Sequence, residues 1–141
     1  MTTIHTTPSV WVSLRTYNAA KALTERIQSF ADGHTLTDPK QESGRVMHAV
    51  GQHASAWLVV DAGATHAHEL RELADRCAHV NDCFRCLVIG AEDTSNWPEQ
   101  SIHMPAHALS SSILDRLRLE SHALRIQSRR SRTVAALRQR P

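Results

Sequence analysis

One aspartate in this chain stands at the expected end of a buried strand. Asp61 follows the apolar run of residues 56–60, and a carboxylate in that position can accept a phosphoryl group. The reaction also needs further carboxylates to hold Mg²⁺ and a lysine to stabilise the transferred group. The ends of the first, fourth and fifth expected strands instead carry Arg15, Gly90 and Met104. We therefore predict that Asp61 is only a vestigial phosphoacceptor position, acting as a turn former or helix cap. The other three residues stand where phosphoryl transfer would need its further groups, so we call them degenerate switch positions. No catalytic residue is expected.

The elements that position these residues follow from the apolar patterns. Short β-rich runs predict strands, and amphipathic runs with a period of about 3.6 residues predict helices. We expect strands over residues 10–14, 34–37, 56–60, 84–89 and 101–104. We expect helices over residues 18–30, 43–52 and 66–79, and a long one from about residue 110. Asn18 is the expected N-cap of the first helix, and Asp38-Pro39 an expected turn.

The alternation of these strands and helices predicts an α/β fold. Parallel strands joined by right-handed helical crossovers give a sheet covered on both faces, which is a three-layer sandwich. The second half resembles a receiver-type, flavodoxin-like domain: a strand, a short covering segment, a short strand ending at Met104-Pro105, and a closing helix. That resemblance implies a five-stranded parallel sheet in the order 2-1-3-4-5, with an extended C-terminal helix.

The 141 residues suffice for one domain with a proper core. We expect a frayed tail over residues 1–8, a degenerate receiver-like domain over residues 9–126 and a basic helical linker or tail over residues 127–141. Residues 112–141 hold eight arginines and two acidic residues, a net charge of +6. Because the whole chain has a net charge of +2, residues 1–111 have a net charge of −4. Within the tail, Arg129, Arg130 and Arg132 form a possible phosphate-binding cluster. A solvated basic linker and a nucleotide or nucleic-acid contact both fit this charge.

Three cysteines at close spacing, Cys77, Cys83 and Cys86, suit a reducing cytoplasm better than a disulfide framework. With His79 they have a spacing that resembles a zinc site. However, Cys77 belongs to an apolar helix stripe and Cys86 to a strand, so we expect core packing and no metal. The chain has neither a P-loop nor a GxGxxG motif, and no cofactor is expected. No apolar run has the length of a membrane span, no signal peptide is apparent, and a cytoplasmic location is expected.

The closing helix carries one apolar stripe that includes Leu114, Leu117 and Leu124, interrupted by Ser121. We expect its first three turns to pack on the sheet and the remainder to project. The closing helix is therefore a candidate interaction helix, and this stripe would pair with the same stripe of a second copy of the chain.

Four segments resemble one family in order and spacing: Cys86-Leu-Val-Ile-Gly-Ala-Glu, Trp97-Pro-Glu99, Met104-Pro105 and Ile113-Leu-Asp-Arg-Leu117. They look like the N-terminal receiver-like domain of FleQ-type flagellar regulators, which are activators of sigma-54 polymerase that contain an AAA+ ATPase. The resemblance implies a domain that is not phosphorylated and acts through homodimerisation and contacts with the ATPase domain. The family's Leu-Phe-Arg-Ser-Leu motif for cyclic di-GMP is replaced by Ala135-Ala-Leu-Arg-Gln139. Cyclic di-GMP binding is therefore not expected, nor, without a helix-turn-helix, is specific DNA binding.

The resulting hypothesis is a non-enzymatic domain in the regulation of flagellar or biofilm transcription. It would associate with itself and with an AAA+ ATPase domain or another regulator, and it would not bind membranes. Two alternatives remain open: a single-domain receiver phosphorylated at Asp61, and a nucleotide or nucleic-acid binder that uses the basic arm.

Overall fold

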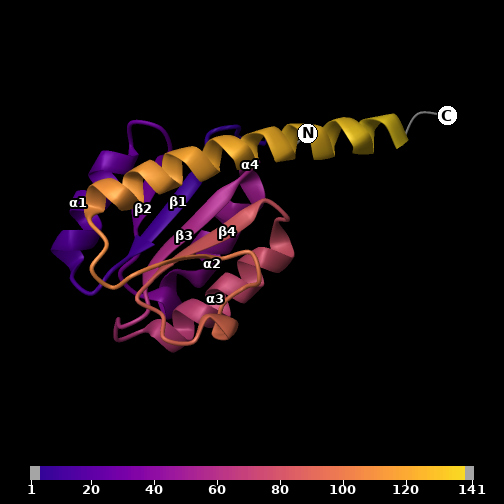
Figure 1. The fold of residues 1–141 in the computed structure, drawn as a ribbon. Coiled ribbons are helices and arrows are strands. Elements are labelled where there is room, and N and C mark those ends of the chain that lie inside the picture. The colour runs from indigo at the N-terminus through magenta and orange to yellow at the C-terminus, as the bar shows by residue number, and fades with distance from the viewer. Residues whose placement is uncertain (1–3, 139–141) are drawn as a thin grey trace.

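The computed structural model describes residues 4–138, with side chains described for residues 4–127. Its centre is a five-stranded parallel sheet in the order β2-β1-β3-β4-β5 (Figure 1). The strands are β1 (Ser9–Ser13), β2 (Asp32–Thr35), β3 (Ala56–Asp61), β4 (Phe84–Ile89) and β5 (Ile102–Met104). The predicted α/β class and strand order are therefore confirmed.

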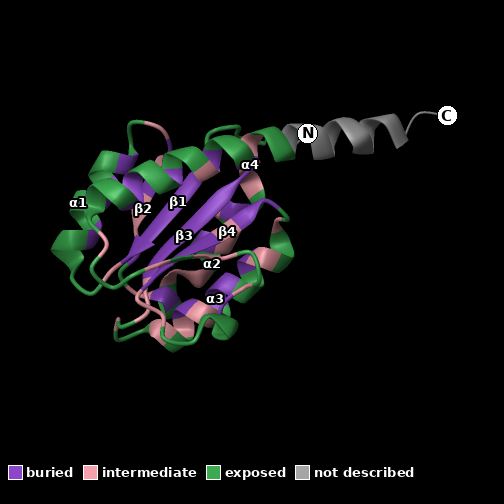
Figure 2. Cartoon of the chain, in the orientation of Figure 1, coloured by how far each residue is buried: buried purple, intermediate pink, exposed green. Residues whose placement is uncertain are grey.

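Helices cover both faces of the sheet and complete the three-layer sandwich. One face carries α1 (Tyr17–Ile27) and α4 (Ser110–Arg138), and the other carries α2 (Pro39–Gln52) and α3 (Ala67–Val80). The connection from β4 to β5 contains only a single turn of 3₁₀ helix, η1 (Thr94–Asn96). The central strands are buried on both sides, as the near-continuous apolar runs of a covered parallel sheet require (Figure 2).

The two apolar clusters follow from the alternation of side chains along each strand. In β3, Trp57 and Val59 face α1 and α4, whereas Leu58 and Val60 face α2 and α3. Register pairs Trp57 with Arg85 of β4, and Val59 with Leu87. The core is thus two clusters separated by the sheet.

Two helix starts differ from expectation. Thr16, not Asn18, is the N-cap of α1, because its hydroxyl accepts a hydrogen bond from the backbone N–H of Ala19. The helix α2 begins at Pro39, four residues earlier than predicted. The expected turn at Asp38-Pro39 is instead the start of this helix. The side chain of Asp38 accepts hydrogen bonds from the N–H groups of Lys40 and Gln41, so Asp38 is the N-cap. Proline suits the first helical position, where no N–H partner is needed.

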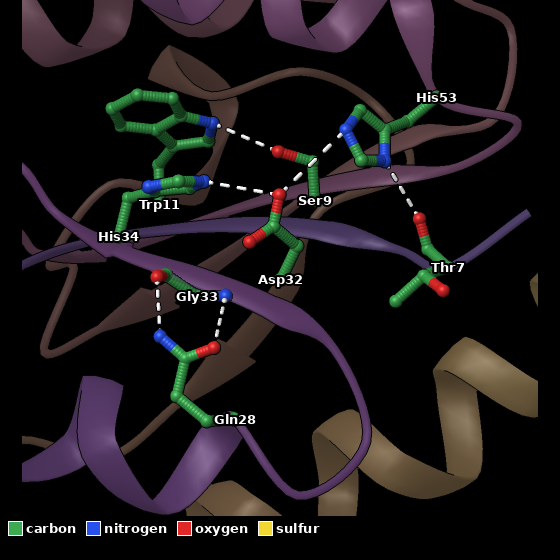
Figure 3. Close-up of polar contacts among 8 residues, drawn as sticks. All are labelled: Thr7, Ser9, Trp11, Gln28, Asp32, Gly33, His34 and His53. Carbon is green, nitrogen blue, oxygen red and sulfur yellow. Dashed lines mark hydrogen bonds and ion pairs between the residues drawn. The ribbon is translucent and has the colours of Figure 1, made fainter. Parts of the chain in front are cut away.

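The first helix also ends earlier, at Ile27, and β2 begins at Asp32 instead of residue 34. The side-chain amide of Gln28 explains the difference. It donates to the carbonyl of Gly33 and accepts from the N–H of that residue (Figure 3). This pair of hydrogen bonds fixes the turn between α1 and β2, so that β2 begins two residues before the position predicted from its polar sequence.

Residues 4–8, within the expected frayed tail, are attached to the domain. His5 forms a parallel β-bridge with His53, and its N–H donates to the carbonyl of Gln52. Nδ1 of His53 lies 2.7 Å from the carbonyl oxygen of Thr7, and its Nε2 lies 3.9 Å from Asp32, which also contacts His34 (Figure 3). The backbone on either side of residue 53 and the imidazole of His53 therefore hold this segment beside the start of the sheet.

The last helix packs on the sheet for longer than three turns. Side chains of α4 are buried from Ile113 to Leu124, and Ser121 is buried among them although its hydroxyl has no hydrogen-bond partner within the described residues. Beyond Leu124 the helix continues past the sheet (Figure 1). No helix in the described part of the chain is long and apolar enough to cross a bilayer.

Candidate functional site

The candidate site lies at the carboxyl ends of the strands, where β1 and β3 are neighbours but lead to helices on opposite faces. Crevices at such crossover points are the usual binding places of open parallel sheets. Asp61 is the last residue of β3, and Arg15 follows β1 by two residues. Gly90 comes directly after β4, and Met104 ends β5. The topology therefore gathers all four sequence-predicted positions at one end of the sheet.

Arg15 and Asp61 form an ion pair. Nε of Arg15 lies 3.3 Å from Oδ1 and 3.2 Å from Oδ2 of Asp61. The carboxylate is half-buried, with 17% of its side chain exposed, whereas the arginine side chain is 65% exposed. Oδ1 also accepts a hydrogen bond of 2.8 Å from the N–H of Gly63. The aspartate is thus held by a guanidinium and by a backbone turn, which is the turn-forming role expected of it. The alternative role of helix cap is not seen, because the N-cap position of α3 is His66 and that helix has no side-chain cap hydrogen bond.

Gly63 lies directly beneath the end of the Arg15 side chain, so any larger residue there would make the arginine shift. A Cβ there would overlap the guanidinium of Arg15. The glycine therefore leaves room for the arginine to reach across from β1 to Asp61.

Gly90 and Met104 have backbone and packing roles. Gly90 has φ of 73°, a left-handed conformation that favours glycine, and its N–H donates to the carbonyl of Met104 over 2.8 Å. The side chain of Met104 packs against the apolar cluster beneath α1 and α4. A thioether in that environment adds apolar contact but no positive charge to the strand ends.

A cavity of about 380 Å³ opens beside the ion pair, between α3 and the β4–β5 connection. Arg15 and Arg71 line it together with Glu92 and Asp93, so both signs of charge are present. The Asp93 carboxylate is engaged as the cap of η1, and its hydrogen bonds to the hydroxyl and N–H of Ser95 lower its pKa. The cavity therefore lacks the convergent set of free carboxylates that a hard divalent cation prefers.

The predicted zinc-like pattern does not form one site. Cys77 and Cys86 are buried in the cluster beneath α2 and α3, whereas Cys83 belongs to the cluster on the opposite face. Burial raises the pKa of the Cys77 thiol to about 12, which disfavours the thiolate that binds metal. Nδ1 of His79 contacts the carbonyl of Asp75 in its own helix. Among residues with described side chains, no three His, Cys, Asp or Glu side chains are placed to hold a metal ion.

The predicted interaction helix carries its apolar residues on two faces. Leu114, Leu117 and Leu124 are buried against the sheet, so in the folded chain they are core residues that a partner cannot contact. Leu119 and Ile126 of the same helix are exposed, and neither was predicted from the sequence as an interaction residue. Their spacing of seven residues, or about two helical turns, could have indicated a second apolar face on this helix. The candidate phosphate cluster of Arg129, Arg130 and Arg132 lies outside the residues whose side chains are described.

Comparison with known proteins adds no family to this geometry: no protein-family model matches the chain, and no curated protein matches it. What the structure establishes is a flavodoxin-like fold of the receiver type with an arginine–aspartate pair at the strand ends.

Proposed function

We propose that this chain is a non-enzymatic, degenerate receiver-like domain that regulates transcription through protein contacts. The observation that carries the proposal is the ion pair between Arg15 and Asp61. A phosphoryl-accepting aspartate needs Mg²⁺ to offset repulsion between the carboxylate and the incoming phosphate. Here a guanidinium attached to the chain already neutralises the carboxylate, and β1 is followed by no acidic residue that would bind the metal.

The other strand ends support the same interpretation. Met104 replaces the lysine that would stabilise a transferred phosphoryl group, and its side chain packs in the core. Gly90 and Ala91 follow β4 without a hydroxyl. Each departure removes one interaction that phosphoryl transfer uses, so signalling through surfaces is the remaining route.

The resemblance to FleQ-type regulators supplies the proposed setting. In that setting the domain forms a homodimer and contacts an AAA+ ATPase domain of a sigma-54 activator in the cytoplasm, as part of flagellar or biofilm control. The projecting end of α4 offers a helical connection through which a change in association reaches a neighbouring domain.

The test is phosphorylation of the full chain by acetyl phosphate with Mg²⁺, followed by intact-mass measurement. We expect no phosphoryl adduct, while a competent receiver treated in parallel acquires one. A stoichiometric adduct on the wild-type chain that Asp61→Asn abolishes would overturn the proposal in favour of a phosphorylated receiver.

A second measurement separates a protein-contact domain from a polyanion binder. Binding of a short duplex DNA at low and at moderate salt is followed by fluorescence anisotropy. We expect no binding tighter than about 10⁻⁴ M at moderate salt, which is the weak end of non-specific binding. Tight binding that weakens steeply with salt would favour the basic arm as the functional site.

A further inference from the structure

The outer surface of α4 carries apolar side chains that nothing in the described part of the chain covers. Leu119 is 67% exposed and Ile126 is 41% exposed. A soluble helix that packs one face on a sheet normally presents polar residues on the opposite face. These two side chains therefore form an unpartnered apolar ridge.

Helical spacing places this ridge on one line. Leu119, Ala123 and Ile126 follow one another by four and three residues, so they share a face of α4. The buried residues Leu117 and Leu124 precede Leu119 and Ile126 by two, which puts the two sets on different sides of the helix. We call Leu119, Ala123 and Ile126 the outer ridge.

Other exposed apolar residues do not form such a line. Among the described side chains the remaining large ones are scattered over separate segments: Ile4, Tyr17, Val80 and Leu109. Isolated exposed apolar side chains are ordinary on protein surfaces, whereas aligned ones on a helix face form a continuous apolar strip that a partner helix can cover.

The distribution of charge along the chain favours a second copy, in antiparallel orientation, as the occupant of the outer ridge. Residues 121–141 contain six arginines and no acidic residue, while residues 1–111 carry a net charge of −4. Two such helices side by side in parallel would bring the two arginine-rich ends together. In an antiparallel pair each basic end instead lies beside residues 110–120 of the other copy, which have no net charge, and near its acidic body.

We propose that the outer ridge binds the same ridge of a second copy, with the two α4 helices antiparallel. Leu119 then faces the partner's Ile126, and Ala123 lies at the crossing, where its small side chain allows the helices to approach closely. This inference rests on the proposed function, because it names the surface and the geometry of the dimer that the function requires.

Sedimentation equilibrium of the full chain tests the surface. We expect a monomer–dimer equilibrium in the wild type, weakened about a hundredfold by Leu119→Glu, since at each of the two symmetry-related contacts an aliphatic pair is replaced by a carboxylate buried against the partner's Ile126. The matched control is Leu109→Glu, the same change at a residue that is 69% exposed but lies off the ridge. It should leave the equilibrium unchanged. A wild type that stays monomeric at all concentrations, or equal weakening by both variants, overturns the inference.

Crosslinking tests the orientation. Leu119→Cys and Ile126→Cys variants are treated with a short bismaleimide, alone and as an equimolar mixture. The antiparallel arrangement predicts a crosslinked dimer mainly in the mixture, where residue 119 of one copy meets residue 126 of the other. Efficient crosslinking of each variant alone indicates a parallel pair and contradicts the proposal. The wild type is the control, because its three cysteines are buried.

These results are distinguishable from failure of the proposed function. If the chain is monomeric yet takes no phosphoryl group, the dimer surface is wrong and the non-enzymatic proposal stands. If a phosphoryl adduct forms on Asp61, the function is wrong whatever the oligomeric state.

Discussion

Arg15 and Asp61 show how a single side chain changes the chemistry available at a strand end. A bound metal ion can exchange with solvent and bridge to a phosphate, whereas a guanidinium attached to the chain only pairs with the carboxylate. Because Arg15 is largely exposed, the pair adds little to stability. The hydrogen bond from Gly63 to Oδ1 holds the carboxylate more firmly.

Substitutions at Asp61 separate these two contributions. Asp61→Asn retains an oxygen for the N–H of Gly63 and removes only the ionic attraction, so we expect the free energy of unfolding to fall by less than about 1 kcal/mol. Asp61→Ala also leaves that N–H without its partner and should cost about 1–3 kcal/mol. Urea unfolding measures both variants. Equal losses would show that the hydrogen bond to Gly63 contributes nothing.

At this scale, residue types were predictable but their contacts were not. The degenerate nature of Arg15, Gly90 and Met104 followed from their order relative to the apolar runs. The ion pair joins residues 46 positions apart, and it depends on the register of β1 with β3 and on the space left by Gly63. Neither condition is visible in a local pattern.

Helix α2 shows how a polar side chain fixes the start of an element. Asp38 accepts from two N–H groups at the helix start, while Oε2 of Glu42 accepts from the N–H groups of Thr37 and Asp38. These reciprocal bonds satisfy donors that the first helical turn leaves free. The helix therefore begins at Pro39 despite the weak apolar pattern there.

Removal of this cap should destabilise the domain measurably. Asp38→Ala is expected to lower the free energy of unfolding by about 1 kcal/mol, within the range of about 0.5–2 kcal/mol found for N-caps. Asp38→Asn keeps an acceptor oxygen and should cost much less. Chemical denaturation of both variants provides the comparison, and an alanine variant as stable as the asparagine variant would rule out a capping role.

Helix α4 offers a matched pair of leucines on different faces. Leu117 is fully buried, and Leu117→Ala should cost about 2–5 kcal/mol, because a cavity remains beneath the helix. Leu119→Ala, studied at a protein concentration where the chain is monomeric, should change stability by less than about 0.5 kcal/mol. Thermal and urea unfolding check both values. A large loss from Leu119→Ala in the monomer would mean that its side chain packs within the chain.

The element scale also explains which boundaries the sequence predicted. Strands β3 and β4 were located closely, because long apolar β-rich runs have few alternatives. The start of α2 and the position of β2 were displaced because side-chain hydrogen bonds from Asp38 and Gln28 determine them, and such bonds leave no periodic pattern. In α4, the predicted stripe of Leu114, Leu117 and Leu124 proved to be core, whereas the exposed apolar residues, Leu119 and Ile126, were not predicted, because sequence alone does not show which side of the helix faces the sheet.

Two thiols buried between the sheet and helices α2 and α3, those of Cys77 and Cys86, link the stability of the whole molecule to pH. Burial raises the pKa of Cys77 from 9.0 to about 12. Burial also raises the pKa of Cys86, and the nearby Cys77 and Asp75 raise it further. An unfolded chain loses these protons near pH 9 while the folded chain keeps them, so the folded state is penalised as the pH rises from 9 towards 12.

We therefore expect stability to decline over that alkaline interval and to show no contribution from these thiols below pH 8. Urea midpoints measured between pH 8 and pH 11 give the slope. Cys77→Ala removes one titrating group, and its stability should decline less steeply with pH even if its absolute value is lower. Identical slopes for the two proteins would contradict the assignment of this effect to Cys77.

At the scale of the whole chain, the architecture was the most predictable feature. Five strands and four α-helices in nearly regular alternation restrict a chain of this size to few arrangements, and the handedness of the crossovers removes most of those. The attachment of residues 4–8 was not predictable, because it depends on His53, which lies far along the chain. The architecture itself does not determine the function, since many functions share it.

The replacement of a full crossover helix by η1 has a dynamic consequence. β5 pairs with β4 through three residue pairs, whereas β3 and β4 share six. Local opening begins where few contacts must break, so amide protons along β5 should exchange with solvent sooner than those of β3. Since α4 begins at Ser110, shortly after β5 ends at Met104, local opening of this edge strand would loosen the start of the long helix without unfolding the centre of the sheet.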